Sequence, residues 1–224
     1  MYIFIFVGVT ILSCLVQANL QNKFKRYSKV PLNSGMTGRE VAEKMLRDNG
    51  IYNVTVTCTP GHLTDHYNPT NGTVNLSESV YHSNSVAAAA VAAHECGHAV
   101  QHAVAYAPLQ LRTALVPVVS FASNTVQWVL LAGILLVEVF PALLLVGIGL
   151  FALTTLFSFV TLPVEIDASR RATQWLSRAG ITSPHNHQMA VSALSSAAYT
   201  YVVAAIGSLA TLLYYVMIFL GRRD

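Results

Sequence analysis

Two histidines four residues apart, with a glutamate beside the first, are the side chains of this chain best suited to chemistry. They are His94, Glu95 and His98, in the segment HECGH. In a helix of 3.6 residues per turn, His94 and His98 lie on the same face, where their imidazoles can bind one Zn²⁺. Glu95 is one step round the helix and can reach a metal-bound water as a general base. This is the H-E-x-x-H pattern of zinc proteases.

The motif lies in a run of helix-forming residues from Ser85 to Ala107. Alanine and valine flank it on both sides, which predicts a packed helix. Two histidines and a glutamate in such a helix cost free energy unless they are paired or ligated. The alternative is a buried helix that carries these residues without a metal. The context favours Zn²⁺ as a cofactor, and a third ligand must then come from elsewhere in the chain.

The composition is that of a membrane protein with a modest polar part. Of 224 residues, 54% are hydrophobic and 10% are charged, whereas soluble domains carry about 25% charged residues. The net charge of +3 is small and the basic residues are spread along the chain, so no nucleic acid partner is expected. Three widely spaced cysteines (Cys14, Cys58 and Cys96) predict neither a disulfide framework nor a cysteine metal site.

About four transmembrane helices are expected. Residues 1–21 predict an N-terminal transmembrane anchor, with a cleaved signal peptide as the alternative. The basic residues that follow place the next segment in the cytoplasm. Residues 116–162 predict a transmembrane hairpin that turns near Glu138. We interpret Glu138 as a residue of the turn at the membrane interface, and the alternative is a functional carboxylate inside the membrane. Residues 197–224 predict a last transmembrane helix. Its orientation stays open, because four spans would place Arg222 and Arg223 outside the cell, against the preference of basic residues for the cytoplasmic side.

The polar segments predict a small α+β domain. Residues 22–115 are expected to form a zincin-like domain that ends in the motif helix. A capping box at residues 37–40 begins an amphipathic helix that ends at Gly50. Short strands follow near residues 54–57, 64–68 and 73–76, the last two joined by a hairpin turn. The expected fold class is an α+β membrane protein, mostly helical, with a short β-sheet beside the transmembrane helices.

Residues 163–196 form a second polar segment that offers the third zinc ligand. Glu165 and Asp167 follow Pro163, which can begin a helix at the membrane exit. Both carboxylates would then lie in the first two turns, where the helix dipole favours them. Two histidines and one carboxylate leave a fourth position open for water, as catalytic zinc requires. Alternatively, the two carboxylates cap the helix and pair with nearby arginines, and the residues alone leave this choice open.

Three stretches resemble the YugP-type membrane zinc metallopeptidases. They are residues 63–69 (LTDHYNP), 91–101 (VAAHECGHAVQ) and 162–171 (LPVEIDASRR), and the resemblance extends over nearly the whole chain. It departs from the family pattern at Asn68, where an acidic residue is usual, and at Cys96, where an aliphatic residue is usual. Neither position is a proposed ligand.

The chain is also distantly similar to HtpX-type integral membrane proteases. There the third ligand is the glutamate of a Glu-x-x-Ala-Asp pattern, which implies Glu165 as the ligand here. Ser169 stands where that pattern has aspartate, so Asp167 or Asp65 could orient the first histidine by accepting a hydrogen bond from its free ring N–H. These resemblances imply a gluzincin-like site with His94, His98 and Glu165 on the metal.

The resemblance implies an integral membrane zinc-dependent endopeptidase. It would hydrolyse peptide bonds of membrane-associated proteins or peptides near the membrane surface, through a zinc-activated water. His66 and Tyr67, on the strand before the motif helix, are candidates to stabilise the oxyanion. The expected location is the bacterial inner membrane, with the active site facing the cytoplasm. The bilayer and a peptide substrate are the expected partners, while other membrane protein partners or a homo-oligomer stay open.

Two alternative functions compete with this prediction. One is a membrane metal-binding scaffold that has lost catalysis, although a purely structural site would not need Glu95. The other is an intramembrane site-2-type protease, which takes its third ligand from an aspartate inside a span. No aspartate occurs in residues 116–162 or 197–220. His102, His185 and His187 are not expected to bind the metal.

Overall fold

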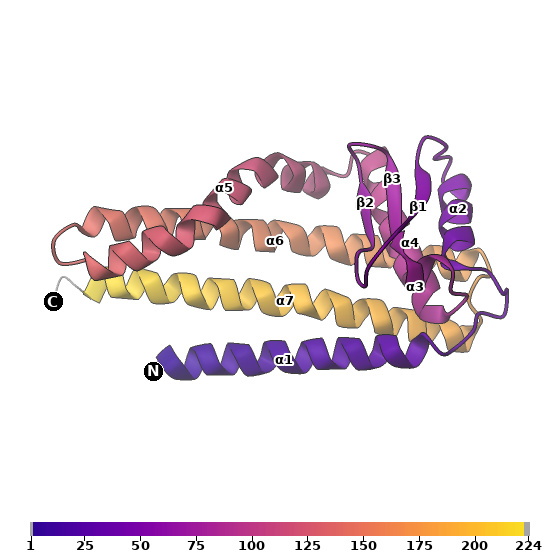
Figure 1. The fold of residues 1–224 in the computed structure, drawn as a ribbon, viewed down its shortest axis with the longest axis horizontal. Coiled ribbons are helices and arrows are strands. Elements are labelled where there is room, and N and C mark those ends of the chain that lie inside the picture. The colour runs from indigo at the N-terminus through magenta and orange to yellow at the C-terminus, as the bar shows by residue number, and fades with distance from the viewer. Residues whose placement is uncertain (1, 222–224) are drawn as a thin grey trace. The chain divides into compact units, whose positions relative to one another are not determined.

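The computed structural model describes residues 2–221, and Arg222 and Arg223, on which the expected orientation of the last span depends, lie outside the described residues. Figure 1 shows the order of the elements. They are α1 (Tyr2–Tyr27), α2 (Gly38–Asp48), β1 (Thr55–Thr59), β2 (His66–Asn68), β3 (Thr73–Ser77), α3 (Glu78–Tyr81), α4 (Val86–Ala103), α5 (Ala107–Leu135), α6 (Pro141–Arg178) and α7 (Pro184–Gly221). The predicted combination of long helices and a short sheet is confirmed.

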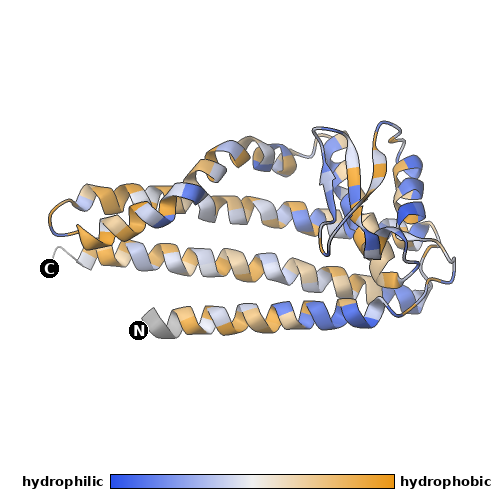
Figure 2. Ribbon diagram, in the orientation of Figure 1, coloured by the Kyte–Doolittle hydropathy of each residue, from blue (hydrophilic) through white to orange (hydrophobic). Residues whose placement is uncertain are grey.

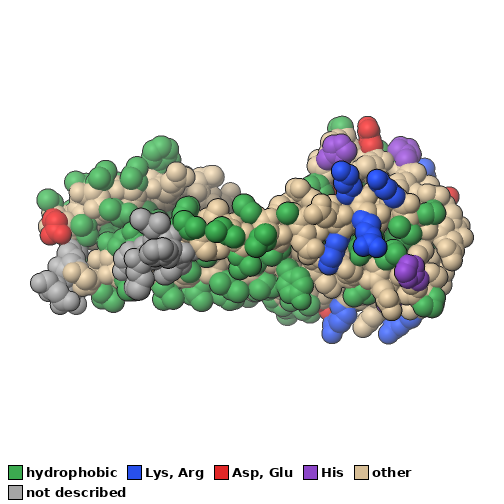
Figure 3. All heavy atoms as spheres, turned by 90° about the horizontal axis from the view of Figure 1, so that it is seen from below, with side chains coloured by type: hydrophobic (Ala, Val, Ile, Leu, Met, Phe, Trp, Pro, Cys, Tyr) green, Lys and Arg blue, Asp and Glu red, His purple; other side chains and the backbone are tan. Residues whose placement is uncertain are grey.

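The residues group into two compact units. The α/β unit comprises residues 16–109 and 163–199, and the helical unit comprises residues 110–162 with the described parts of 1–15 and 200–224. Hydrophilic residues concentrate on the sheet, α2 and the second half of α1 (Figure 2). On the face drawn in Figure 3, lysine, arginine and histidine side chains gather on the α/β unit, while hydrophobic side chains cover the helical unit. This partition suits a polar domain attached to membrane helices.

Helix α2 begins and packs as its sequence predicts. The Thr37 hydroxyl accepts a hydrogen bond from the backbone N–H of Glu40 at 3.3 Å, and the Glu40 carboxylate accepts one from the backbone N–H of Thr37 at 2.7 Å. This reciprocal capping box satisfies two helix-end donors. The apolar face of the helix, formed by Val41, Ala42, Met45 and Leu46, is buried in the core of the α/β unit.

The sheet has the strand order β1-β3-β2. Strand β1 runs parallel to β3, and β2 pairs with β3 in the antiparallel direction, as the predicted hairpin requires. Gly72 in the hairpin turn has φ +64°, a conformation that favours glycine. Val74 and Leu76 of the central strand are fully buried. Because β3 is the central strand, β2 lies at an edge of the sheet.

Helix α4 carries the H-E-x-x-H motif through the core of the α/β unit. The Ser85 hydroxyl caps it by accepting a hydrogen bond from the backbone N–H of Ala88 at 3.2 Å. Its alanines from Ala87 to Ala99 are almost completely buried, most of them against α2, the sheet and the parts of α6 and α7 that belong to this unit. Small side chains let these elements approach α4 closely, so the motif sits on a firmly held helix.

Helices α5 and α6 form the predicted apolar hairpin in the helical unit. The chain turns at residues 136–140, and Glu138 is exposed within that turn. A Cβ on Gly133 would lie 2.7 Å from the Leu144 Cα, and a Cβ on Gly147 would lie 2.8 Å from the Leu130 side chain. These two glycines allow the backbones of the hairpin to pack closely.

The expectation that Pro163 begins a new helix was wrong. Helix α6 runs without a break from Pro141 to Arg178, with Pro163 in its interior. A proline there removes the hydrogen bond to the carbonyl of Phe159, but the residues before and after it continue the helix. Glu165 and Asp167 therefore lie in mid-helix, and a helix N-terminus does not stabilise their charges.

The expected number of membrane spans was also higher than the structure supports. Among the described residues, three helices are long and apolar enough to cross a membrane, namely α5, α6 and α7. Helix α1 is not among them.

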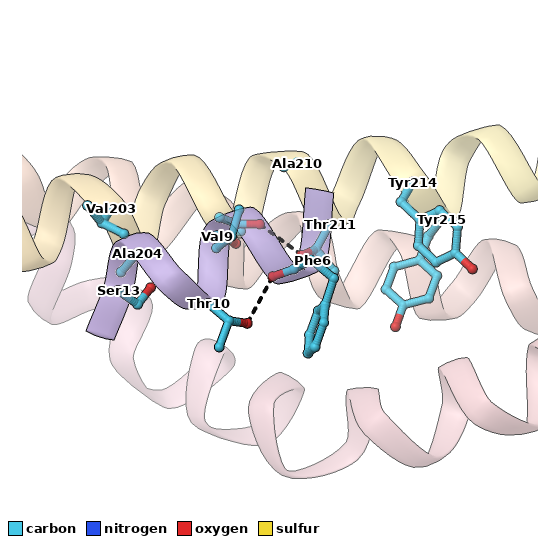
Figure 4. Close-up of a pocket in the computed structure, with 12 residues that line it drawn as sticks. Phe6, Val9, Thr10, Ser13, Val203, Ala204, Ala210, Thr211, Tyr214 and Tyr215 are labelled. Atoms are coloured by element: carbon cyan, nitrogen blue, oxygen red, sulfur yellow. Dashed lines mark hydrogen bonds between the residues drawn. The ribbon is translucent and has the colours of Figure 1, made fainter. Parts of the chain in front are cut away.

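The helical unit contains a cavity of about 640 Å³ between α1 and α7. Figure 4 shows its wall, which is mostly apolar with a few hydroxyl groups. The Thr10 hydroxyl donates to the Phe6 carbonyl at 2.9 Å, and the Thr211 hydroxyl donates to the Gly207 carbonyl at 2.8 Å. These two hydroxyls are satisfied within their own helices, so they do not require a polar ligand.

Candidate metal centre

His94 and His98 present their imidazoles together on one face of α4. Their ring centroids are 4.8 Å apart and their planes are nearly perpendicular, at 82°. The helical repeat places residues i and i+4 one above the other, which accounts for this pairing. Both side chains are largely enclosed, with His98 9% exposed. The two rings form one wall of a small, protected polar site.

Glu165 of α6 completes the group. Its Oε2 atom lies 3.4 Å from His94 Nε2 and 3.7 Å from His98 Nε2. One ligand atom from each of the three residues falls within 4.8 Å of the others, and this is the group of candidate metal-binding side chains found in the described part of the chain. A tetrahedral ion with bonds of about 2.0–2.1 Å separates its ligands by roughly 3.4 Å. The three side chains therefore fit one zinc ion.

Two small residues let the helices that carry these ligands meet. Gly97 lies just before His98 on α4, and a Cβ there would lie only 2.6 Å from the backbone oxygen of Ala168 on α6. Ala168 is fully buried and follows Glu165 by one helical turn. Any side chain at position 97 would push α4 and α6 apart. The site therefore depends on backbone contact between two helices that are distant in sequence.

The electrostatics of the group favour a cation. Burial raises the pKa of the Glu165 carboxyl, but hydrogen bonds and charge from His94 and His98 outweigh burial and hold that pKa well below its ordinary range. Burial lowers the pKa of His98, but the hydrogen bond to Glu165 and the charges of Glu95 and Glu165 raise it above the ordinary value. Glu165 is thus a fixed, buried negative charge that attracts a positive partner, and a metal ligand must be ionised in the same way.

The Nδ1 atom of each histidine ring has its own hydrogen-bond partner. His94 Nδ1 lies 3.1 Å from the Ser169 hydroxyl, and His98 Nδ1 lies 3.1 Å from the Gln101 amide oxygen. These contacts leave both Nε2 atoms directed at Glu165. Zinc-binding histidines need such partners because the second hydrogen bond fixes the orientation of the ring.

Asp167 does not belong to the group of three candidate ligands, and it contacts Gln101. Its carboxylate accepts hydrogen bonds from Arg170, Arg171 and the buried amide of Gln101. Burial raises the pKa of Asp167, but the hydrogen bonds from Arg171, Gln101 and Arg170 lower it overall. Asp167 therefore contacts a partner of His98, whereas the sequence suggested that it could contact the first histidine directly.

Glu95 faces the edge strand of the sheet. Its Oε2 accepts a hydrogen bond from the backbone N–H of Tyr67 at 3.0 Å. Since β2 pairs with β3 on its other side, this N–H points toward the free edge of the sheet. Glu95 as a residue is 9% exposed. Glu95 thus lies next to His94 and beside the strand edge.

Tyr67 spans two turns of α4. Its N–H is bonded to Glu95, and its hydroxyl lies 3.3 Å from His102 Nδ1. Residues 95, 98 and 102 share one helical face, so Tyr67 contacts the face of α4 that also carries His98. Burial raises the pKa of Tyr67. Its hydroxyl therefore stays protonated at neutral pH and can donate a hydrogen bond.

Two of the candidate residues lie farther from the group. His66 precedes Tyr67 on β2 and so points to the opposite face of the sheet. Its ring contacts the Thr64 carbonyl at 2.7 Å and the Asn75 amide at 3.3 Å. Asp65 accepts hydrogen bonds from the backbone and hydroxyl of Ser77. The observed contacts of both residues support the sheet, and of Asp65, His66 and Tyr67 it is Tyr67 that contacts the motif helix.

Sequence reasoning missed Gln101 and Ser169, the partners of the two histidines. Each could have been found from helical spacing. Gln101 follows His98 by three residues, and Ser169 follows Glu165 by four, so each shares a face with a ligand. What the sequence did not indicate was which polar neighbour turns inward, because that depends on how closely α4 and α6 pack.

The chain has detectable relatives along its whole length. A family model described as "Putative neutral zinc metallopeptidase" matches residues 2–220. The chain is 44% identical over 226 residues to a protein of Bacillus subtilis (strain 168) named "Putative membrane protease YugP", and the match covers 100% of this chain and 99% of that protein. No solved structure matches significantly. These matches confirm the resemblance that residues 63–69, 91–101 and 162–171 indicated.

Proposed function

Because the chain belongs to the family described as "Putative neutral zinc metallopeptidase", with zinc as its cofactor, we propose that it is an integral membrane zinc-dependent endopeptidase. Its substrates are peptide bonds of membrane-associated proteins or peptides near the membrane surface. The observation that carries this proposal is the convergence of His94, His98 and Glu165, with Glu95 next to the first ligand. Its relative in Bacillus subtilis is named a membrane protease.

The proposed site uses His94, His98 and Glu165 to hold the metal and Glu95 to move a proton. When bound, zinc supplies Lewis acidity, which lowers the pKa of a coordinated water and polarises a carbonyl. Glu95 takes a proton from the attacking water and passes it to the nitrogen of the leaving amine. Its position beside the open strand edge lets one carboxylate serve both steps.

Tyr67 is the residue we propose to stabilise the developing negative charge. Its hydroxyl remains protonated and lies near His102, on the helical face that also carries His98. Such a donor contributes when it is aimed at the oxyanion in a site shielded from water. His66 is a weaker candidate, because its ring lies on the other face of the sheet.

The free edge of β2 suits an extended substrate. A peptide can add to an exposed strand through main-chain hydrogen bonds. The Tyr67 N–H at this edge is already bonded to Glu95, so a peptide that pairs with other backbone groups of the edge would lie beside the proposed base. This arrangement favours hydrolysis of unfolded or flexible segments over folded domains.

The proposed location is the bacterial inner membrane. Helices α5, α6 and α7 supply apolar spans, and residues 1–21 are proposed as an additional anchor. Lys23, Lys25, Arg26 and Lys29 follow that anchor, which places the α/β unit and its site on the cytoplasmic side.

A variant of the general base tests the proposal. The purified full-length chain in detergent is assayed with fluorescein-labelled casein, an unfolded protein substrate. Glu95→Gln should abolish cleavage while zinc content stays near one ion per chain. A scaffold without catalysis predicts no cleavage by either protein, and activity that survives in Glu95→Gln would exclude Glu95 as the base.

A further inference from the structure

Gln101 is a buried amide that the proposed reaction does not use directly. It lies on α4 one turn after His98, and its residue is 0% exposed. Its Oε1 is 3.1 Å from His98 Nδ1, and its Nε2 donates to the Val164 carbonyl at 2.8 Å and to Asp167 Oδ2 at 3.0 Å. All polar atoms of this side chain are therefore engaged. A buried amide is costly unless its groups are satisfied.

The partners of Gln101 decide which way its amide faces. The NH₂ group meets a carbonyl oxygen and a carboxylate oxygen, both of which only accept hydrogen bonds. Rotating the amide by half a turn would set its oxygen against those two oxygens and its NH₂ against the ring of His98. The amide oxygen therefore faces His98. Because this oxygen can only accept, the proton of the imidazole must sit on Nδ1.

We propose that Gln101 is a positioning residue that holds His98 in the tautomer with its lone pair on Nε2, aimed at the metal. The inference rests on the proposed metal site. Gln101 is in turn fixed by Asp167, which Arg170 and Arg171 hold through their guanidinium groups. Arg171, Asp167, Gln101 and His98 thus form one chain of hydrogen bonds that connects α6 to the motif helix.

The two histidines differ in this respect. Ser169 lies 3.1 Å from His94 Nδ1, but a hydroxyl can either donate or accept. Ser169 therefore orients the ring of His94 without selecting its tautomer. Gln101 allows only one tautomer at His98. This asymmetry predicts that Gln101 contributes more to metal affinity than Ser169 does.

The test measures the zinc dissociation constant of the full-length protein by competition with a chelator. Gln101→Met keeps the length of the side chain and removes both hydrogen-bonding groups. It should weaken zinc binding by about 10–100-fold, the usual effect of losing a partner of a metal-binding histidine. The matched control is Asn186→Leu, which removes a buried amide that donates to the Pro31 carbonyl. This control should lower thermal stability and leave zinc affinity unchanged.

A paired variant separates positioning from simple packing. Gln101→Glu sets a second carboxylate against Asp167 and should bind zinc more weakly than the wild type. Adding Asp167→Asn supplies an amide that can donate to the new carboxylate, which still accepts from His98 Nδ1. The double variant relieves the repulsion at residue 167, but a carboxylate oxygen still faces the Val164 carbonyl, so it should bind zinc more tightly than Gln101→Glu and more weakly than the wild type. This rescue also keeps the proposal testable if Gln101→Met does not fold.

A spectroscopic readout reports the tautomer itself. Nitrogen-15 NMR of metal-free, histidine-labelled protein at alkaline pH, where the imidazole is neutral, should show His98 protonated on Nδ1 in the wild type and a mixture of tautomers in Gln101→Met. Unchanged zinc affinity and an unchanged tautomer in a folded Gln101→Met protein would overturn the inference. A wild type that binds no zinc would instead overturn the proposed function.

Discussion

Gly97 and Ala168 bring two helices from distant parts of the chain into backbone contact. A Cβ on Gly97 would lie 2.6 Å from the Ala168 carbonyl oxygen and 3.1 Å from its Cα. Gly97 directly precedes His98, and Ala168 lies one turn after Glu165. The spacing of the proposed ligands therefore depends on the absence of one methyl group.

Gly97→Ala should disrupt the metal site. The obstructing atoms are backbone atoms of α6, which cannot rotate away, so the helices must separate. Overpacking of this kind costs typically about 1–3 kcal/mol of folding free energy, and the displaced Glu165 should weaken zinc binding at least tenfold. Gly149→Ala is the control, because a Cβ there meets nothing within 4 Å. Equal zinc affinity in both variants would contradict the proposed role of the contact.

Ser169→Ala should weaken zinc binding by about tenfold, since His94 loses the partner of its Nδ1 atom. Thr173→Ala is the matched control, because the Thr173 hydroxyl bonds only to backbone carbonyls of its own helix. Ser169→Asp would place an aspartate where the distantly similar proteases have one, and it should bind zinc at least as well as the wild type. The zinc dissociation constants of the three variants check this order.

Tyr67→Phe should lower kcat by about 100-fold while zinc content is unchanged, because the variant loses only a hydroxyl donor. His66→Ala changes the neighbouring residue on the other face of β2 and should leave kcat within a few-fold of the wild type. The casein assay measures both. If the reverse order were found, His66 rather than Tyr67 would act on the substrate.

Zinc affinity should fall with acidification, beginning at a higher pH than for an exposed histidine. Zinc binding requires a neutral His98. Burial lowers the pKa of His98, but Glu165 and Glu95 raise it above the ordinary value, which is about 6.5. Protons therefore compete with zinc once the pH falls below this raised pKa. Dissociation constants measured between about pH 8 and pH 5 should begin to rise above pH 6.5, and a break below that value would contradict the assignment.

Local patterns in the sequence predicted much of this fold. The capping box at Thr37, the hairpin turn before β3 and the apolar hairpin that turns at Glu138 are each encoded within a few residues, and each is found in the structure. The same holds for the shared face of His94 and His98. Such features depend on helical period and turn chemistry, which short stretches of sequence specify.

Features that depend on tertiary packing were harder to predict. Proline signals a helix start in isolation, but Pro163 lies in the interior of a long helix. The roles of Gln101 and Asp167 depend on the approach of α6 to α4, which Gly97 permits. The assignment of His94, His98 and Glu165 as ligands and Glu95 as the base stays a prediction that this geometry supports.

Anomalous X-ray diffraction at the zinc absorption edge, on crystals of the full-length protein, tests the central claim most directly. The account predicts one zinc peak, bounded by His94 Nε2, His98 Nε2 and a Glu165 oxygen at about 2.0–2.2 Å. A peak ligated by Asp167 in place of Glu165, or one located away from the two histidines, would contradict it.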